Sequence, residues 1–120
     1  MEQNPLEKIA KSWIAAINNH DADALASLYE ADAVHKSPNL RKQKPETLGI
    51  ITGRDAIREW ERRAFSTMPS LHYVLREVTT SGDRAWIDYI RTVDGQPPRN
   101  VAELLIVRKN LIIESRVYNG

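Results

Sequence analysis

Residues 84–107 read RAWIDYIRTVDGQPPRNVAELLIV, and this stretch decides the fold. Two runs rich in aliphatic and aromatic residues flank the polar segment 94–98, which contains one glycine and two prolines. Two such runs joined by a short turn segment predict a β-hairpin. The first run is apolar on both sides, with Trp86 and Ile90 on one and Ala85, Ile87 and Tyr89 on the other.

Strand patterns continue on both sides of this hairpin. We expect strands over residues 71–79, 84–94, 99–108 and 111–118, separated by turns at 81–83, 94–98 and 109–110. Consecutive hairpins imply an antiparallel sheet. Because helical patterns precede the strands instead of alternating with them, the predicted fold class is α+β.

The first half of the chain has a mainly helical pattern. Its first apolar residues recur at the spacing of one helical face: Leu6, Ile9, Ala10, Trp13, Ile14 and Ile17. Asn4 suits the N-terminus of this helix, and Asp21 suits that of a short second one. A short strand at 32–38 and a helix at about 54–67 follow. The polar stretch 39–49 is expected to be a loop without core residues.

The composition argues against several functions. The chain has 17 Lys plus Arg against 16 Asp plus Glu, a net charge of +1, so it lacks the cation excess of a nucleic-acid-binding domain. It has no cysteine, and its 3 histidines lack the spacing of a metal site, so we expect neither metal nor cofactor. Residues 1–120 fit one domain. With no signal peptide and no apolar run of membrane length, we expect a cytoplasmic protein that does not bind membranes.

Several of the expected strands are apolar on both faces, and residues 101–107 are almost continuously so. A sheet face exposed to solvent would alternate apolar with polar residues. We therefore expect helices on one face and a second copy of the chain on the other. This pattern predicts a homodimer through the outer face of the sheet.

The hairpin contains charged and phenolic residues that could carry chemistry. A turn centred near Pro97 would place Arg91 directly opposite Glu103, and Tyr89 opposite Leu105. An ion pair on a buried apolar face is costly. The pair therefore indicates either a functional site at a cavity or a partly exposed contact at its rim.

Other candidates lie outside the hairpin. His35, on the short strand, can exchange protons near neutral pH; the alternative is a hydrogen-bonded structural histidine. Trp13 and Trp60 lie on apolar helix faces and either fill the core or line a pocket under the sheet. Whether Ser115 points inward depends on the length of the last turn. A two-residue turn at 109–110 points Glu114 and Arg116 inward, whereas a three-residue turn, favoured by the apolar set, points Ile113, Ser115 and Val117 inward.

Three segments carry a resemblance to a known family: WIAAINNHD at residues 13–21, LYEADAVH at 28–35 and GRDAI at 53–57. Together with the order of elements, they resemble the nuclear-transport-factor-2-like superfamily over about residues 5–119. Within it, the chain is most similar to the SnoaL-like and ketosteroid-isomerase-like small proteins. The resemblance implies a curved antiparallel sheet wrapped by the N-terminal helices into a cone, a cystatin-like α+β barrel. It also implies a blind pocket and a dimer through the outer sheet face.

The ketosteroid isomerases of this superfamily provide a test of function. Their oxyanion-hole tyrosine, their general-base aspartate before a proline and their second carboxylic acid would fall at Trp13, Ser37 and Glu103. Tryptophan has no phenol, and serine is not a base for a carbon-bound proton. Only Glu103 keeps its role by side-chain class, so the chain is not expected to be a true ketosteroid isomerase.

What remains is a cofactor-independent isomerase, cyclase or dehydratase that acts on a small apolar or aromatic carbonyl compound, as the resemblance to SnoaL-like polyketide cyclases implies. Glu103 or His35 would move the proton, and Arg91 and Tyr89 would donate hydrogen bonds to the developing oxyanion. The implied ligand-binding residues are Trp13, Ser37, Trp60, Ile87, Leu105 and Ser115. The alternatives are a non-catalytic small-molecule-binding or dimerisation module, and a structural protein whose aromatic side chains fill the cone.

Overall fold

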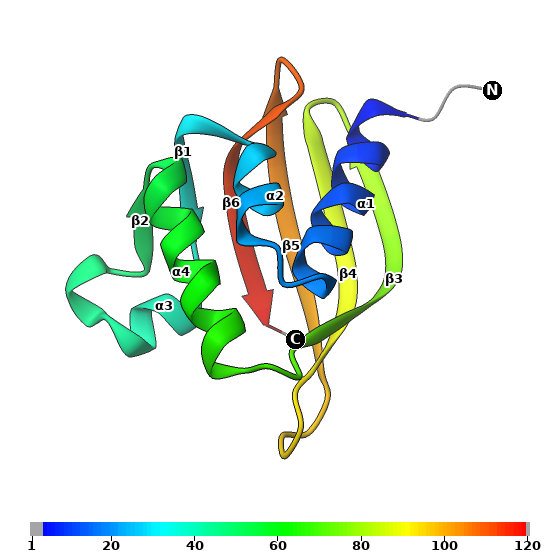
Figure 1. Ribbon diagram of the computed structural model, residues 1–120. Helices are drawn as coiled ribbons and strands as arrows, with labels where there is room; N and C mark the ends of the chain where they lie inside the picture. The colour runs from blue at the N-terminus through cyan, green and yellow to red at the C-terminus, as the bar shows by residue number, and fades with distance from the viewer. Residues whose placement is uncertain (1–3, 120) are drawn as a thin grey trace.

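The four C-terminal strands form the antiparallel meander that the hairpin predicts. The computed structural model describes residues 4–119, and six strands form one curved, open sheet in the order β2-β1-β6-β5-β4-β3 (Figure 1). The strands are β1 (Tyr29–Lys36), β2 (Ile50–Thr52), β3 (His72–Ser81), β4 (Arg84–Thr92), β5 (Arg99–Arg108) and β6 (Leu111–Asn119). The helices are α1 (Pro5–Asn18), α2 (Ala22–Ser27), α3 (Pro38–Gln43) and α4 (Arg54–Thr67), with a short 3-10 helix, η1, at Pro45–Thr47. The predicted α+β class is confirmed.

The sheet is mixed, which corrects the expectation of a wholly antiparallel one. β1 runs parallel to β6, with His35 opposite Ser115, and antiparallel to β2 on its other side. Parallel neighbours need a long connection. Here that connection contains α4 and the first three strands of the meander. The pairing places two polar side chains from distant parts of the sequence side by side.

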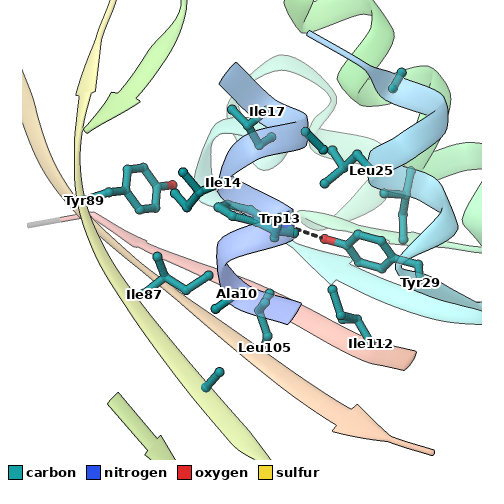
Figure 2. Close-up of a cluster of buried hydrophobic side chains, with 14 of the residues drawn as sticks. Ala10, Trp13, Ile14, Ile17, Leu25, Tyr29, Ile87, Tyr89, Leu105 and Ile112 are labelled. Carbon is teal, nitrogen blue, oxygen red and sulfur yellow. Dashed lines mark hydrogen bonds between the residues drawn. The ribbon is translucent and has the colours of Figure 1, made fainter. Parts of the chain in front are cut away.

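The helices α1, α2 and α4 cover one face of the sheet (Figure 1). The predicted caps are present: the Asn4 side chain accepts a hydrogen bond from the backbone N–H of Leu6, and the Asp21 side chain accepts one from Ala24. Trp13 on α1 lies between Tyr89 of β4 and Tyr29 of β1 (Figure 2). The buried face of α1 consists of Ala10, Trp13, Ile14, Ala16 and Ile17.

The prediction of a loop without core residues at 39–49 is wrong. The segment contains most of α3 and all of η1, and Leu40 is completely buried. Ser37 caps α3, because its hydroxyl accepts hydrogen bonds from the backbone N–H groups of Asn39 and Leu40. Gly49 has a φ of +80°, and a Cβ atom there would lie 3.0 Å from the backbone oxygen of Ser37. Glycine therefore allows the chain to close against the start of α3.

The predicted register of the central hairpin is also wrong. Arg91 lies opposite Arg99 instead of Glu103, and Glu103 lies opposite Ile87. The chain turns around Gly95, which has a φ of +81°, and not around the prolines that follow. The shift is an even number of residues, so the same side chains still point inward.

The last strand combines the two alternatives left open by the sequence. Lys109 and Asn110 both have positive φ and form a two-residue turn. A bulge then leaves Ile113 without a partner on β5, and this reverses the alternation of β6 beyond it. Ser115 is therefore completely buried despite the short turn, and Ile112 takes the core position expected of Ile113.

The outer face of the sheet carries exposed aromatic and aliphatic side chains. Trp86 and Tyr118 pack against each other with ring centroids 5.4 Å apart, and each is about two-fifths exposed. Val74 on β3 is similarly exposed. The homodimer through this face stays a prediction. Within residues 4–119, no helix is long and apolar enough to span a membrane.

Candidate active site

A cavity of about 710 Å³ opens at one end of the cone. The helix α3, the C-terminal end of α4 and the loop 93–98 between β4 and β5 lie at this end (Figure 1). The volume is within the range typical of small-molecule sites. The alternative of a cone filled by aromatic side chains is therefore wrong.

The most deeply buried acid of the cavity is Glu103 on β5, which is only 2% exposed. Its Oε1 accepts a hydrogen bond of 3.3 Å from the Tyr89 hydroxyl, whereas its buried Oε2 has no hydrogen-bond partner. Burial, and then the charge of Glu61, raise the pKa of the Glu103 carboxyl well above its ordinary value. Glu103 is therefore held towards its neutral form, with a proton available to donate.

A second carboxyl group, Glu61 on α4, lines the same cavity. Burial raises the pKa of Glu61 to about 7, so both of its protonation states are populated near neutral pH. Glu61 was not among the site residues expected from the sequence. Glu61 follows Ile57 by one helical turn, on the apolar face that also contains Trp60 and Ala64, and that spacing was the signal that could have identified it.

Four side chains, one of which lies beside Glu103, form a hydrogen-bond chain, here called the inner chain. Trp13 Nε1 donates to Tyr29 Oη (3.2 Å), and Tyr29 donates to Ser115 Oγ (3.1 Å). Ser115 Oγ lies 2.7 Å from His35 Nδ1. The Ser115 hydroxyl therefore links Tyr29 to His35.

His35, at the end of the inner chain, is uncharged at neutral pH. Burial lowers the pKa of His35 to about 4, so the imidazole is neutral at pH 7. His35 Nδ1 lies 3.9 Å from Glu103 Oε2, beyond hydrogen-bond distance. His35 is thus a neutral neighbour of Glu103.

Aromatic rings of Trp13, Tyr73 and Tyr89 form one wall of the cavity. Tyr73 and Tyr89 stack with ring centroids 4.1 Å apart. Trp13 packs against both, at 5.9 Å from Tyr73 and 6.0 Å from Tyr89. The wall offers flat apolar surface next to the two carboxyl groups, as an apolar or aromatic ligand requires.

Most residues that the sequence placed at the site do line the cavity: Trp13, His35, Ser37, Trp60, Tyr89, Arg91 and Glu103. The others do not. Ile87, Leu105 and Ser115 are completely buried in the core, and Ile87 and Leu105 lie beneath α1 (Figure 2). Ser115 points inward, as the favoured alternative predicted, but its hydroxyl belongs to the inner chain and does not line the cavity.

The expected ion pair between Arg91 and Glu103 is absent, because the hairpin register separates the two residues. Arg91 Nη1 instead donates to Gln96 Oε1 at 3.1 Å, and Nη2 donates to the sulfur of Met68 at 3.1 Å. The guanidinium therefore lies at the cavity entrance. Residues 4–119 contain no group of three or more His, Cys, Asp or Glu side chains that could hold a metal ion.

Solved structures share this architecture over nearly the whole chain. A SnoaL-like protein of unknown function from Burkholderia thailandensis has a TM-score of 0.88 and 22% identity, covering 99% of this chain and 97% of that one. A proposed polyketide cyclase from Sinorhizobium meliloti has a TM-score of 0.78 and 18% identity, covering 97% and 100%. These likenesses show the fold.

A third structure comes from Catenulispora acidiphila and has a ketosteroid-isomerase-like fold. It was solved in complex with trimethylamine, with a TM-score of 0.74 and 25% identity, covering 92% of this chain and 84% of that one. No curated protein matches the chain significantly. The sequence model of the SnoaL-like domain family, however, matches residues 10–112. Because that match spans most of the described elements, from α1 to β6, the chain belongs to the SnoaL-like domain family.

Proposed function

We propose that the protein is a cofactor-independent acid–base catalyst, an isomerase, cyclase or dehydratase, that acts on an apolar carbonyl compound bound in the cavity. One observation carries the proposal: two carboxyl groups, Glu61 and Glu103, line the same aromatic cavity, and one oxygen of the buried Glu103 has no partner. Two carboxyls in environments that separate their protonation states are suited to opposite roles in proton transfer.

Glu61 is the group that moves the proton. With a pKa of about 7, its carboxylate can take a proton from the carbon next to the substrate carbonyl and return it to another carbon. The electrons of the broken C–H bond form the carbon–carbon double bond of an enol or enolate. The carbonyl π electrons move onto oxygen, and no redox partner is needed.

Glu103 stabilises the oxygen on which charge develops. Its neutral form carries a proton that Oε2 can donate to the substrate oxygen, because Oε1 already accepts a hydrogen bond from Tyr89. Such a donor, fixed in a cavity with little water, favours the enolate over the carbonyl ground state.

Two roles expected from the sequence change under this proposal. His35 is neutral and hydrogen-bonded to Ser115, so we assign it to positioning beside Glu103 instead of to proton transfer. The guanidinium of Arg91 lies at the entrance, and we assign it to substrate binding. Trp13 and Ser37 still argue against Δ5-3-ketosteroid isomerisation, since neither supplies the group that reaction needs.

The test does not require the natural substrate. A panel of apolar ketones is incubated with the protein in deuterated buffer, and loss of the protons next to the carbonyl is followed by NMR. We expect catalysed exchange for a subset of the panel, reduced about 10²–10⁴-fold in Glu61→Gln and in Glu103→Gln. The matched control is Glu59→Gln, an exposed glutamate on the same helix, which should exchange at the native rate. Exchange that is equal in all four proteins would contradict the proposal.

A second candidate is non-catalytic binding of a small organic cation. The trimethylamine complex of the Catenulispora relative favours it, and so does the wall of Trp13, Tyr73 and Tyr89, because aromatic faces attract ammonium groups. Trimethylammonium chloride titrated into the protein separates the two candidates. Binding that needs Glu61, together with absence of exchange across the ketone panel, would favour the binding protein over the enzyme.

A further inference from the structure

Two arginines of the central hairpin face each other at the cavity entrance. Arg91 on β4 and Arg99 on β5 are direct cross-strand partners, and both line the cavity. They are here called the entrance arginines. Like charges placed directly opposite each other in an antiparallel pair destabilise a sheet. The ligand-free chain therefore carries a repulsion at this position.

Nothing in the described part of the chain neutralises this repulsion. Within residues 4–119, no carboxylate lies within 4.0 Å of either entrance arginine. The contacts of Arg91 are an amide oxygen and the thioether of Met68, which is a weak acceptor. A guanidinium is suited to bidentate binding of an oxyanion, and none is supplied by the protein.

The opposite wall of the entrance adds two more cations. Arg41 and Lys42, in the last turn of α3, line the same cavity, and neither pairs with a carboxylate in residues 4–119. The net charge of the chain is only +1, so this grouping of four cations is local. The cavity's acids do not cancel it, because Glu103 is held towards its neutral form and Glu61 is ionised only in part. A mouth lined by one sign of charge concentrates ligands of the opposite sign.

We propose that the ligand of this cavity carries an oxyanion group, a carboxylate or a phosphate, that binds between Arg91 and Arg99. Its apolar body then extends past the aromatic wall, and its reactive carbonyl reaches Glu61 and Glu103. Only one part of this inference, the position of the carbonyl, rests on the proposed function. It narrows the substrate class to apolar carbonyl compounds that bear an anionic group at the end remote from the reacting carbon.

Calorimetric titration with matched naphthalene probes tests the proposal without turnover. The probes are 2-naphthoate, 2-naphthyl phosphate and the neutral 2-naphthamide. We expect at least one anion to bind about tenfold or more tightly than the amide, and the tighter of the two identifies the preferred oxyanion. The preference should weaken as salt is added. Equal binding of all three probes would overturn the proposal.

Substitutions of the entrance arginines test whether these residues cause the preference for anionic probes. Arg91→Gln and Arg99→Gln should each lower anion affinity about tenfold and leave amide affinity unchanged. Arg108→Gln removes the same charge from the other, exposed end of β5 and should bind as the native protein does. The Tm of the ligand-free protein should rise by about 1–4 °C in Arg91→Gln or Arg99→Gln, because the repulsion is relieved. A fall in Tm together with unchanged anion binding would mean that the arginines have a structural role.

The outcomes separate this inference from the proposed function. Anion preference without proton exchange on any ketone would support the entrance site and contradict catalysis. Proton exchange that depends on Glu61, in a protein with no anion preference, would support catalysis and contradict the entrance site.

Discussion

The inner chain and the cavity lining differ in how far their polar groups are satisfied by the protein. In the inner chain, hydrogen bonds link Trp13, Tyr29, Ser115 and His35 in series, and the only titratable group that could carry a positive charge, His35, is neutral. In the cavity, the buried Glu103 has an oxygen without a partner, and at the entrance the two entrance arginines face each other. Satisfied buried groups stabilise a fold, whereas unsatisfied ones lower its stability. We therefore infer that the inner chain mainly stabilises the fold, and we propose that the unsatisfied groups of the cavity lining serve a ligand.

The largest effect is expected from breaking the inner chain. Tyr29→Phe removes the hydroxyl that accepts from Trp13 and donates to Ser115, and so leaves the indole N–H without an acceptor. We expect the free energy of unfolding to fall by about 2–3 kcal/mol, measured by urea denaturation. Tyr118→Phe on the exposed outer face is the control and should change it by less than about 0.5 kcal/mol. Equal losses of stability in the two variants would contradict the stabilising role of the inner chain.

Glu103→Gln is expected to raise the free energy of unfolding, in contrast to Tyr29→Phe. Because the pKa of Glu103 is raised in the folded protein, the folded state keeps a proton that the unfolded state releases above its ordinary pKa of 4.5. The stability of the native protein therefore falls as pH rises from there towards the raised pKa. The variant lacks this proton, so its stability relative to that of the native protein should increase as pH rises from about 4.5 towards about 9.

Denaturation curves of native protein and Glu103→Gln across that pH range measure the difference. Glu114→Gln is the matched control, since the carboxylate of Glu114 pairs with Lys36 and Arg116 and its pKa is lowered. This control should gain no stability at high pH. If Glu103→Gln is the less stable protein at about pH 9, Glu103 is not an unsatisfied acid.

Side-chain parity along a strand could be predicted from the sequence, whereas the register between strands could not. Alternation along β4 and β5 correctly placed Tyr89, Arg91 and Glu103 on the inner face, because parity does not depend on where the turn lies. Register does depend on it, and the turn at Gly95 instead of Pro97 replaced a predicted ion pair with two facing arginines. The positive charge at the cavity entrance therefore could not be predicted from the sequence.

Glu61 and Ser115 were difficult for other reasons. A glutamate within a helical stripe is usually exposed, and only the closed cone shows that this helix face borders a cavity. Ser115 points inward because of a bulge, and bulges leave no reliable signal in a single sequence. The segment that forms α3 is only six residues long, too short for helical periodicity to identify.

The smallest effect on the stability of the isolated chain is expected at a third surface, the outer face of the sheet. Trp86 and Tyr118 are large, about two-fifths exposed and packed against each other, and the predicted homodimer would cover them. Trp86→Arg should change the free energy of unfolding of the monomer by about 0.5 kcal/mol or less. It should nevertheless shift the protein from dimer to monomer in size-exclusion chromatography with light scattering.

Ser66→Arg provides the control, because it adds the same charge to an exposed position of α4, on the helical side of the sheet. It should elute with the native protein. A native protein that is monomeric throughout a dilution series would contradict the dimer. The exposed pair of aromatic rings would then resemble the entrance arginines, a surface feature whose partner is something other than this chain.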